Sequence, residues 1–229
     1  GQEVIAESNP YSFLENKVDV QVTLTVNDRP RAKGAHDITV KPAASELSLL
    51  YMNWVEENRR LVDELSGGRI GYIHIPNTHY DGYRSFFKYF QPLMKKDALI
   101  IDERYNGGGH SPYQMVEIMK RRVYSYWARR NMKLYPLPMP VNEGPKAMLI
   151  NGLSSSGGDA FPAYFREAGL GPLIGQTTWG GLIGYGYSPR FVDGGSFAVP
   201  GFAYVNKEGE WDVEAVGISP DPGFEVFDD

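Results

Sequence analysis

The sequence predicts an α/β fold built around a parallel sheet. From residue 69 onward, short apolar runs alternate with stretches in which apolar residues recur at helical spacing, as β-α-β units require. Two of the apolar runs, residues 98–102 and 147–150, are each followed by a glycine-rich turn. Because ligands bind beyond the carboxyl ends of strands in open α/β sheets, we expect these two turns to face one cleft.

The first part of the chain predicts a smaller β module. A short helix is expected at 10–15, an alternating strand at 18–26 and a partner strand at 36–40. Pro42 separates this module from a long helix at 45–65, which a pair of glycines at 67 and 68 ends.

The remaining elements follow from the same local patterns. Strands are expected at 70–75, 98–102 and 147–150, and helices at 81–94, 112–121 and 157–168. Four prolines predict a surface loop over residues 134–145. Residues 196–211 resemble a hairpin.

Composition excludes several classes of function. The net charge of −5 argues against non-specific nucleic-acid binding, and the arginine pairs at 121–122 and 129–130 are typical of a solvated face. The chain has no cysteine, which excludes disulfides, thiolate catalysis and cysteine-based metal sites. No apolar run reaches the roughly 20 residues that cross a bilayer. No motif calls for a metal or an organic cofactor, so none is expected.

The turn at 151–160 is the strongest candidate for chemistry. It carries three serines and two glycines between a buried strand and a helix, and Ser156 opens that helix. Backbone N–H groups and the positive end of a helix stabilise negative charge, which suits a serine nucleophile. The same residues also suit an ordinary helix-capping turn, so both interpretations stay open on this motif alone.

The turn at 105–109 is the second candidate. Its three glycines follow the strand at 98–102, and they can supply a backbone amide for an oxyanion. The alternative is an anion-binding or merely tight turn. It matches neither a P-loop nor a dinucleotide-binding fingerprint.

Five motifs, in this order, resemble those of the S41 tail-specific (C-terminal processing) peptidases, most of all the tricorn type. They are Gly68–Pro76, Ile101–Gly109, Asn151–Asp159, Gly175–Gly181 and Glu214–Asp221. The resemblance implies a ClpP/crotonase-like ββα-spiral peptidase core at residues 43–229. It also implies that residues 1–42 are the later part of a PDZ-like module.

The resemblance assigns roles to individual residues. Ser156 aligns with the nucleophile, whereas Ser154 and Ser155 are turn residues. The Gly157 amide is implied as one oxyanion donor, and the turn at Gly108 and Gly109 as the source of the other. Glu214 aligns with the glutamate of the tricorn-type charge relay, and the alternative for it is an exposed strand glutamate. Asp102, Glu103 and Asp159 are interpreted as structural.

One departure from the family pattern concerns the general base. Bacterial tail-specific peptidases use a Ser-Lys dyad, and the lysine position is Gly181 here. The tricorn-type histidine precedes the PDZ module, so the chain is expected to be a fragment that lacks it. Of the four histidines, His74 is interpreted as a sheet residue, and only His110 is a plausible local substitute.

The function implied is a serine endopeptidase that acts on peptides through an acyl-enzyme, with this fragment alone inactive. The alternatives are a non-catalytic peptide-binding module and a crotonase-type acyl-CoA enzyme, and an essential Ser156 argues against the latter. Residues 179–184 either bind an extended peptide by β-augmentation or form a simple connection. The family likeness implies a cytoplasmic homo-oligomer, a hexamer in tricorn, with no membrane or nucleic-acid partner. Cleavage specificity does not follow from the sequence.

Overall fold

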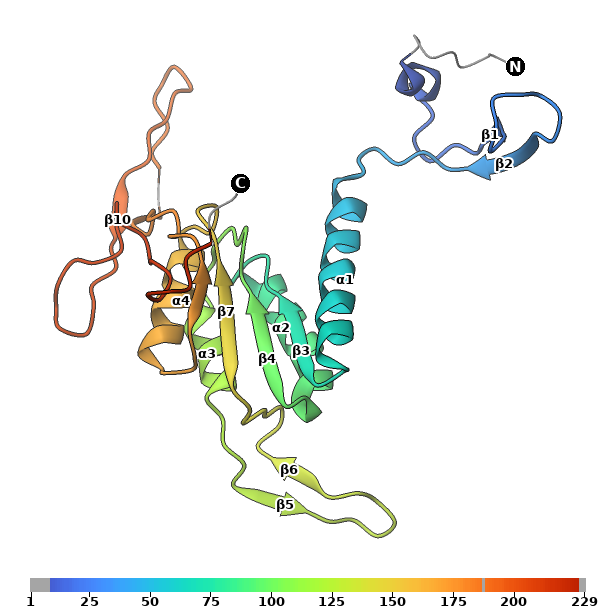
Figure 1. Ribbon diagram of the computed structural model, residues 1–229. Coiled ribbons are helices and arrows are strands. Elements are labelled where there is room, and N and C mark those ends of the chain that lie inside the picture. The colour runs from blue at the N-terminus through green and yellow to red at the C-terminus, as the bar shows by residue number, and fades with distance from the viewer. Residues whose placement is uncertain (1–8, 187, 227–229) are drawn as a thin grey trace. The chain divides into compact units, whose positions relative to one another are not determined.

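The computed structural model describes residues 9–186 and 188–226, and Figure 1 shows the arrangement of its elements. The chain divides into two compact units, Gly1–Val55 and Glu56–Asp229. This division falls inside a helix, at a different place from the boundary expected between residues 42 and 43. The boundary between a PDZ-like module and a peptidase core therefore stays a prediction.

The smaller unit contains a 3-10 helix and a β-hairpin. The 3-10 helix η1 spans Pro10–Leu14. Strands β1 (Val22–Val26) and β2 (His36–Val40) pair antiparallel. The strand expected at 18–26 begins only at Val22, because a turn precedes it: Val20 donates its N–H to the Lys17 carbonyl, and Asp19 has φ +60°. The PDZ likeness of this hairpin stays a prediction.

Helix α1 (Leu47–Ser66) confirms the long helix predicted at 45–65. Gly67 and Gly68 both have positive φ, and the Gly68 amide donates to the Asp63 carbonyl, so the two glycines end the helix as predicted. None of the helix's residues is buried by the described parts of the chain.

The larger unit is built on a parallel four-stranded sheet of order β3-β4-β7-β8, which confirms the predicted α/β class. Strand β8 was not predicted, because three residues are too short to show a period. The strands are β3 (Ile70–His74), β4 (Ala98–Asp102), β7 (Lys146–Ile150) and β8 (Leu173–Gly175).

Three helices lie on one side of this sheet (Figure 1). They are α2 (Tyr80–Phe90), α3 (Pro112–Met119) and α4 (Gly157–Glu167). The helix predicted at 81–94 is divided: the 3-10 helix η2 (Gln91–Lys95) follows α2, with Pro92 in its first turn.

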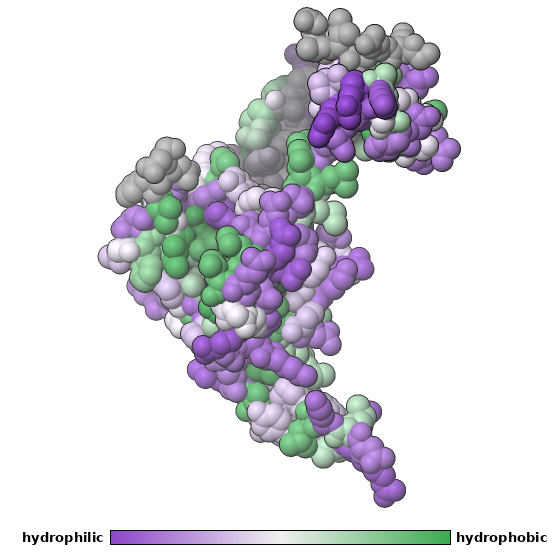
Figure 2. Space-filling model, turned by 45° about the vertical axis from the view of Figure 1, so that its right-hand side comes forward, coloured by the Kyte–Doolittle hydropathy of each residue, from purple (hydrophilic) through white to green (hydrophobic). Residues whose placement is uncertain are grey.

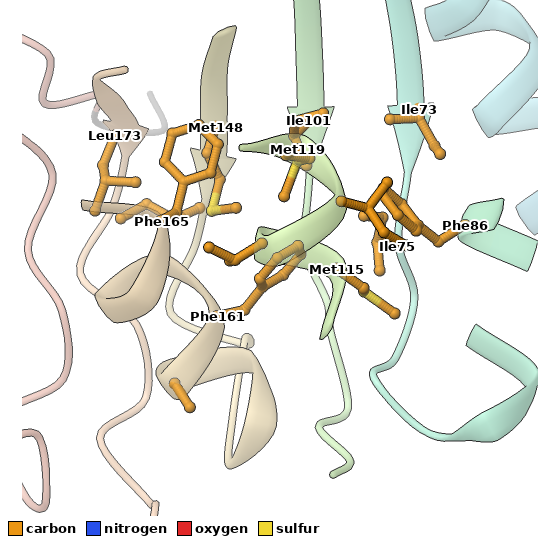
Figure 3. Close-up of a cluster of buried hydrophobic side chains, with 14 of the residues drawn as sticks. Ile73, Ile75, Phe86, Ile101, Met115, Met119, Met148, Phe161, Phe165 and Leu173 are labelled. Carbon is orange, nitrogen blue, oxygen red and sulfur yellow. The ribbon is translucent and has the colours of Figure 1, made fainter. Parts of the chain in front are cut away.

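The core lies between the helices and the sheet (Figure 3). Strands supply aliphatic and methionine side chains, and helices supply methionines and phenylalanines. Labelled members of this core are Ile73, Ile75, Phe86, Ile101, Met115, Met119, Met148, Phe161, Phe165 and Leu173. Because β4 and β7 are fixed side by side by this packing, the turns that follow them are fixed as well.

The proline-rich segment differs from the predicted surface loop. Residues Tyr135–Leu137 form strand β6, which pairs antiparallel with β5 (Ser125–Trp127). Val141 and Asn142 are buried. The Asn142 side chain donates to the carbonyls of Leu93 and Lys96, and these bonds hold the end of the segment against the larger unit.

The C-terminal region confirms only part of the expected hairpin at 196–211. Val205 and Trp211 form an antiparallel bridge. Strand β10 (Pro200–Phe202), however, pairs with β9 (Gly184–Tyr185), which is distant in sequence. In the described residues, no helix combines the length and the apolar character that spanning a membrane requires.

Candidate active site

The two glycine-rich turns lie against each other. They follow β4 and β7, which are neighbours in the sheet. The Ser155 amide donates to the Asn106 carbonyl at 2.9 Å. A Cβ placed on Gly108 lies 2.8 Å from the Ser156 Cβ, so only a glycine allows this approach. The expectation that both turns face one site is confirmed by this geometry.

Ser156 lies at the N-cap of α4, but its side chain makes no capping hydrogen bond. Its backbone has φ +57° and ψ −117°, whereas an N-cap serine that caps its helix has extended backbone angles. Positive φ in a non-glycine residue costs on the order of 1–3 kcal/mol and persists only where its surroundings enforce it. The capping interpretation of Ser156 therefore does not hold, and its hydroxyl is not used to cap the helix.

The backbone amides differ in their availability to an oxyanion. The Gly108 amide donates to the Asn106 side-chain oxygen at 2.8 Å, so it is already used. The amides of Gly109 and Gly157 donate to no acceptor among the described residues. A Cβ placed on Gly157 meets the backbone N and O of Gly109, so these two peptide groups are in close contact. The geometry thus favours Gly109 over Gly108 as the partner of Gly157.

Residues 179–183, which we call the strap, pass beside the serine turn. Every amide of the strap donates within the chain: Trp179 to the Ser154 carbonyl, Gly180 and Gly181 to the Asp159 carboxylate, and Leu182 and Ile183 to Glu214. Edge pairing with a peptide needs free backbone groups. Because these donors are occupied, the strap fits the alternative of a structural connection and not that of β-augmentation.

Glu214 is not an exposed strand residue. Its Oε2 accepts the amides of Leu182 at 2.7 Å and Ile183 at 2.6 Å. Both bonds end on the same carboxylate oxygen. Leu182 also lines the cleft beside Ser156, so Glu214 lies next to the site that the sequence assigned to it.

A cleft of about 340 Å³ opens beside Ser156. Its lining contains no lysine, arginine, aspartate or glutamate, and its members are His79, Gly107, Gly109, His110, Pro112, Tyr113, Ser156, Gly157, Ala160, Tyr164, Leu182, Phe202, Ala203 and Tyr204. The rings of Tyr164 and Tyr204 lie 6.0 Å apart, and burial raises the pKa of both phenols. The lining of the cleft is therefore largely aromatic and includes two histidines.

The histidines of the cleft are His79 and His110, whose rings meet edge to face at 5.9 Å. The sequence identified His110 but not His79, since no motif surrounds the latter. Neither forms a hydrogen bond with the Ser156 hydroxyl among the described residues. His74 is a sheet residue as predicted: its Nε2 contacts the Arg104 carbonyl at 2.9 Å, and burial lowers its pKa.

The acidic residues near the turns have distinct surroundings. Asp102 is buried and accepts hydrogen bonds from Tyr72 and Arg104, so it is structural as predicted. Glu103 is completely buried, its two oxygens have no hydrogen-bond partner among the described residues, and burial raises its pKa well above the usual range. In the described parts of the chain, no group of three or more metal-ligating side chains occurs.

Comparison with known proteins identifies the family. The sequence profile of peptidase family S41 matches residues 69–223, more than half of the chain. The chain belongs to peptidase family S41. This S41 member is 36% identical over 228 residues to the tricorn protease homolog of Saccharolobus solfataricus, covering 98% of the chain and 21% of that relative. It is 34% identical over 221 residues to the tricorn protease of Thermoplasma acidophilum, covering 96% of the chain and 20% of that relative.

Solved structures agree with this S41 assignment. The crystal structure of tricorn protease matches with a TM-score of 0.89 and 33% identity, over 99% of this chain and 22% of that one. The photosystem II D1 C-terminal processing protease matches with a TM-score of 0.52 and 20% identity, over 69% of this chain and 42% of that one, and shows the shared fold alone. The predicted resemblance is confirmed. This S41 member spans about a fifth of the length of the curated relatives it matches.

Proposed function

We propose that this S41 member is the nucleophile-bearing part of a tricorn-type serine peptidase. The observation that carries the proposal is the geometry of Ser156: it sits in a strained turn, caps no helix, and lines a cleft together with two amides that have no acceptor. A serine that serves only as a cap uses its hydroxyl for the helix. Family membership favours a peptidase over an acyl-CoA enzyme of the same general fold.

In the proposed reaction, the Ser156 Oγ attacks the carbonyl carbon of the scissile peptide bond. The developing oxyanion accepts hydrogen bonds from the Gly157 and Gly109 amides, and loss of one such donor typically costs about 3 kcal/mol of transition-state stabilisation. The C–N bond then breaks, and the serine proton reaches the leaving amine through the general base. Water attacks the acyl-enzyme, releases the acid and restores the hydroxyl.

The general base is proposed to be a histidine from a part of the protein outside this chain, supported by Glu214. Gly181 stands where Ser-Lys members have their lysine, and neither cleft histidine is hydrogen-bonded to Ser156 among the described residues. Glu214 accepts the strap amides through Oε2, so its Oε1 can accept a hydrogen bond from the charge relay.

The substrates are proposed to be peptides, as the protease names of the relatives suggest. The assembly is proposed to be a homo-oligomer in the cytoplasm. The cleft lining is aromatic and contains no lysine, arginine, aspartate or glutamate, which favours apolar side chains of the peptide as its occupants. Light scattering on the full-length protein tests the assembly: a mass of a single chain contradicts it.

A covalent probe tests the reaction. The full-length protein and the 229-residue chain are incubated with a fluorophosphonate, and the adduct is located by mass spectrometry, with Ser156→Ala as control. We expect an adduct on Ser156 in the full-length protein and a much slower reaction in the isolated chain. His79→Ala and His110→Ala are expected to leave the labelling rate of the full-length protein within a few-fold. Loss of labelling in either variant assigns the base to that histidine instead.

The alternative function is peptide binding without catalysis. It is favoured if the full-length protein forms no adduct but binds extended peptides in the cleft. In that case Ser156→Ala leaves peptide affinity unchanged.

A further inference from the structure

The Ser156 backbone is held by a closed ring of hydrogen bonds. The Ser156 amide donates to the Gly181 carbonyl at 3.1 Å, and its carbonyl accepts the amides of Asp159 at 2.9 Å and Ala160 at 3.0 Å. The strained φ of +57° thus depends on where Gly181 lies. If Gly181 moves, the Ser156 amide loses its acceptor and the turn can relax.

Asp159 is the residue that fixes Gly181. Its Oδ1 accepts the Gly180 amide at 2.7 Å and its Oδ2 accepts the Gly181 amide at 3.2 Å. The side chain is completely buried, so water does not compete for these bonds. Asp159 lies on α4, three residues after Ser156. Ser156 is bonded to Gly181 and Gly181 to Asp159, so the ring of hydrogen bonds begins and ends within one turn of the helix.

The spacing of Ser156 and Asp159 makes their observed hydrogen-bond partners unusual. Ser156 and Asp159 have the spacing of a capping box, in which the acidic residue accepts the amide of the N-cap residue. Here the carboxylate accepts strap amides, and the N-cap amide goes to the strap carbonyl instead. Neither the Ser156 side chain nor the Asp159 side chain therefore caps the helix.

We propose that Asp159 is a positioning residue that sets the nucleophile through the strap. Asp159 touches neither the cleft nor the reacting atoms; it holds Gly180 and Gly181, and Gly181 holds Ser156. Glu214 fixes the other half of the strap through Leu182 and Ile183, so two carboxylates secure four consecutive amides. This inference rests on the proposed function of Ser156.

The test compares Asp159→Asn with Glu103→Gln in the full-length protein. Asparagine keeps the volume of Asp159 but turns an N–H₂ group toward one of the two strap amides. Since a displacement near 1 Å can cost about 100-fold in rate, we expect kcat on a peptide substrate to fall by about 10- to 100-fold. KM should stay within about threefold, because the cleft lining is unchanged. Glu103→Gln alters an equally buried carboxyl that contacts no strap amide, and should keep kcat within about twofold.

Hydrogen exchange gives a readout that does not require turnover. In Asp159→Asn the amides of Gly180 and Gly181 should exchange faster, while those of β4 stay protected. In the wild type, residues 179–183 should exchange slowly, and this measurement stands even if the variant does not fold. Rapid exchange of the wild-type strap, or an unchanged kcat in a folded Asp159→Asn, overturns the inference. An equal loss of kcat in Glu103→Gln also overturns it.

The two proposals fail separately. Absence of a Ser156 adduct in the wild type contradicts the serine-peptidase function and leaves the exchange result as the test of the strap. A normal wild-type adduct with an equal labelling rate in Asp159→Asn contradicts the positioning role alone.

Discussion

Ser156 and Gly108 show how closely two turns must approach for the serine to be presented to the cleft. Gly108 has φ +83°, and a side chain there would contact the Ser155 carbonyl, the Ser156 Cβ and the Gly157 amide. The requirement for glycine is therefore both conformational and steric. Gly107, one residue earlier, has neither constraint, since nothing lies within 4 Å of a Cβ placed on it.

This difference gives a matched pair of substitutions. Gly108→Ala should lower the free energy of unfolding by more than about 2 kcal/mol, because it combines strain with a clash. It should also abolish labelling of Ser156. Gly107→Ala should change stability by less than about 1 kcal/mol. Chemical denaturation of both variants measures the change in the free energy of unfolding. Equal changes in the two variants would show that the two turns are not in close contact at Gly108.

At the scale of elements, α4 and its N-cap supply the proposed nucleophile and part of the cleft. Ser156, Ala160 and Tyr164 are spaced four residues apart, so they lie along one face of the helix and all line the cleft. Further lining comes from Leu182 of the strap and from Phe202 and Tyr204, in β10 and the residues after it.

The aromatic wall predicts a selective effect on substrate binding. Tyr164→Ala removes one ring of the Tyr164–Tyr204 pair. For peptides with a large apolar side chain beside the scissile bond, we expect KM to rise about tenfold, which corresponds to about 1.4 kcal/mol. For peptides with alanine at that position, KM should change by less than about threefold. Tyr126→Ala, in the exposed β5–β6 hairpin, is the control and should change KM for neither peptide. Equal effects on both peptides would argue against side-chain binding at Tyr164.

At the scale of the whole molecule, many large hydrophobic side chains are exposed on the surface. Hydrophobic residues gather in a patch on the larger unit (Figure 2). Exposed aromatic side chains of the larger unit include Trp179, Tyr185, Phe191, Phe197, Phe202 and Trp211. Large exposed apolar patches are typical of interaction surfaces, which agrees with the proposed assembly.

Buried Glu103 makes the stability of the whole molecule depend on pH. Burial raises its folded-state pKa, so the folded protein keeps this proton at pH values where the unfolded chain has lost it. The contribution of Glu103 to the free energy of unfolding is therefore fully present below the ordinary glutamate pKa. It is lost as the pH rises toward the raised pKa that Glu103 has in the folded protein. Glu103→Gln cannot lose that proton.

We accordingly expect the difference in unfolding free energy between Glu103→Gln and wild type to grow in favour of the variant as pH rises above about 4.5, the ordinary glutamate value. Urea titrations at several pH values measure it. Glu117→Gln, a change at an exposed glutamate paired with Lys120, should show no such trend. A difference that is constant with pH would mean that burial does not raise the pKa of Glu103 in the folded protein.

The sequence by itself determined the features that depend on neighbouring residues. Periodicity predicted α1, β2, β4 and β7 almost to the residue, and the order of glycine and serine motifs predicted the family and Ser156. These signals are short-range: strand and helix patterns, and turns that only glycine permits. Strand β8 and the β5–β6 hairpin were missed because three-residue strands have no readable period.

The tertiary structure decided which polar groups are used and which remain available. That Asp159 accepts amides 21 and 22 residues away, and that Phe202 and Tyr204 line the cleft with Ser156, both depend on distant segments meeting. A hydrogen-bonding group takes whichever partner the packed fold brings to it. Local sequence left a helix cap and a nucleophile both open for Ser156, and in the packed fold its side chain lines a cleft and does not cap the helix.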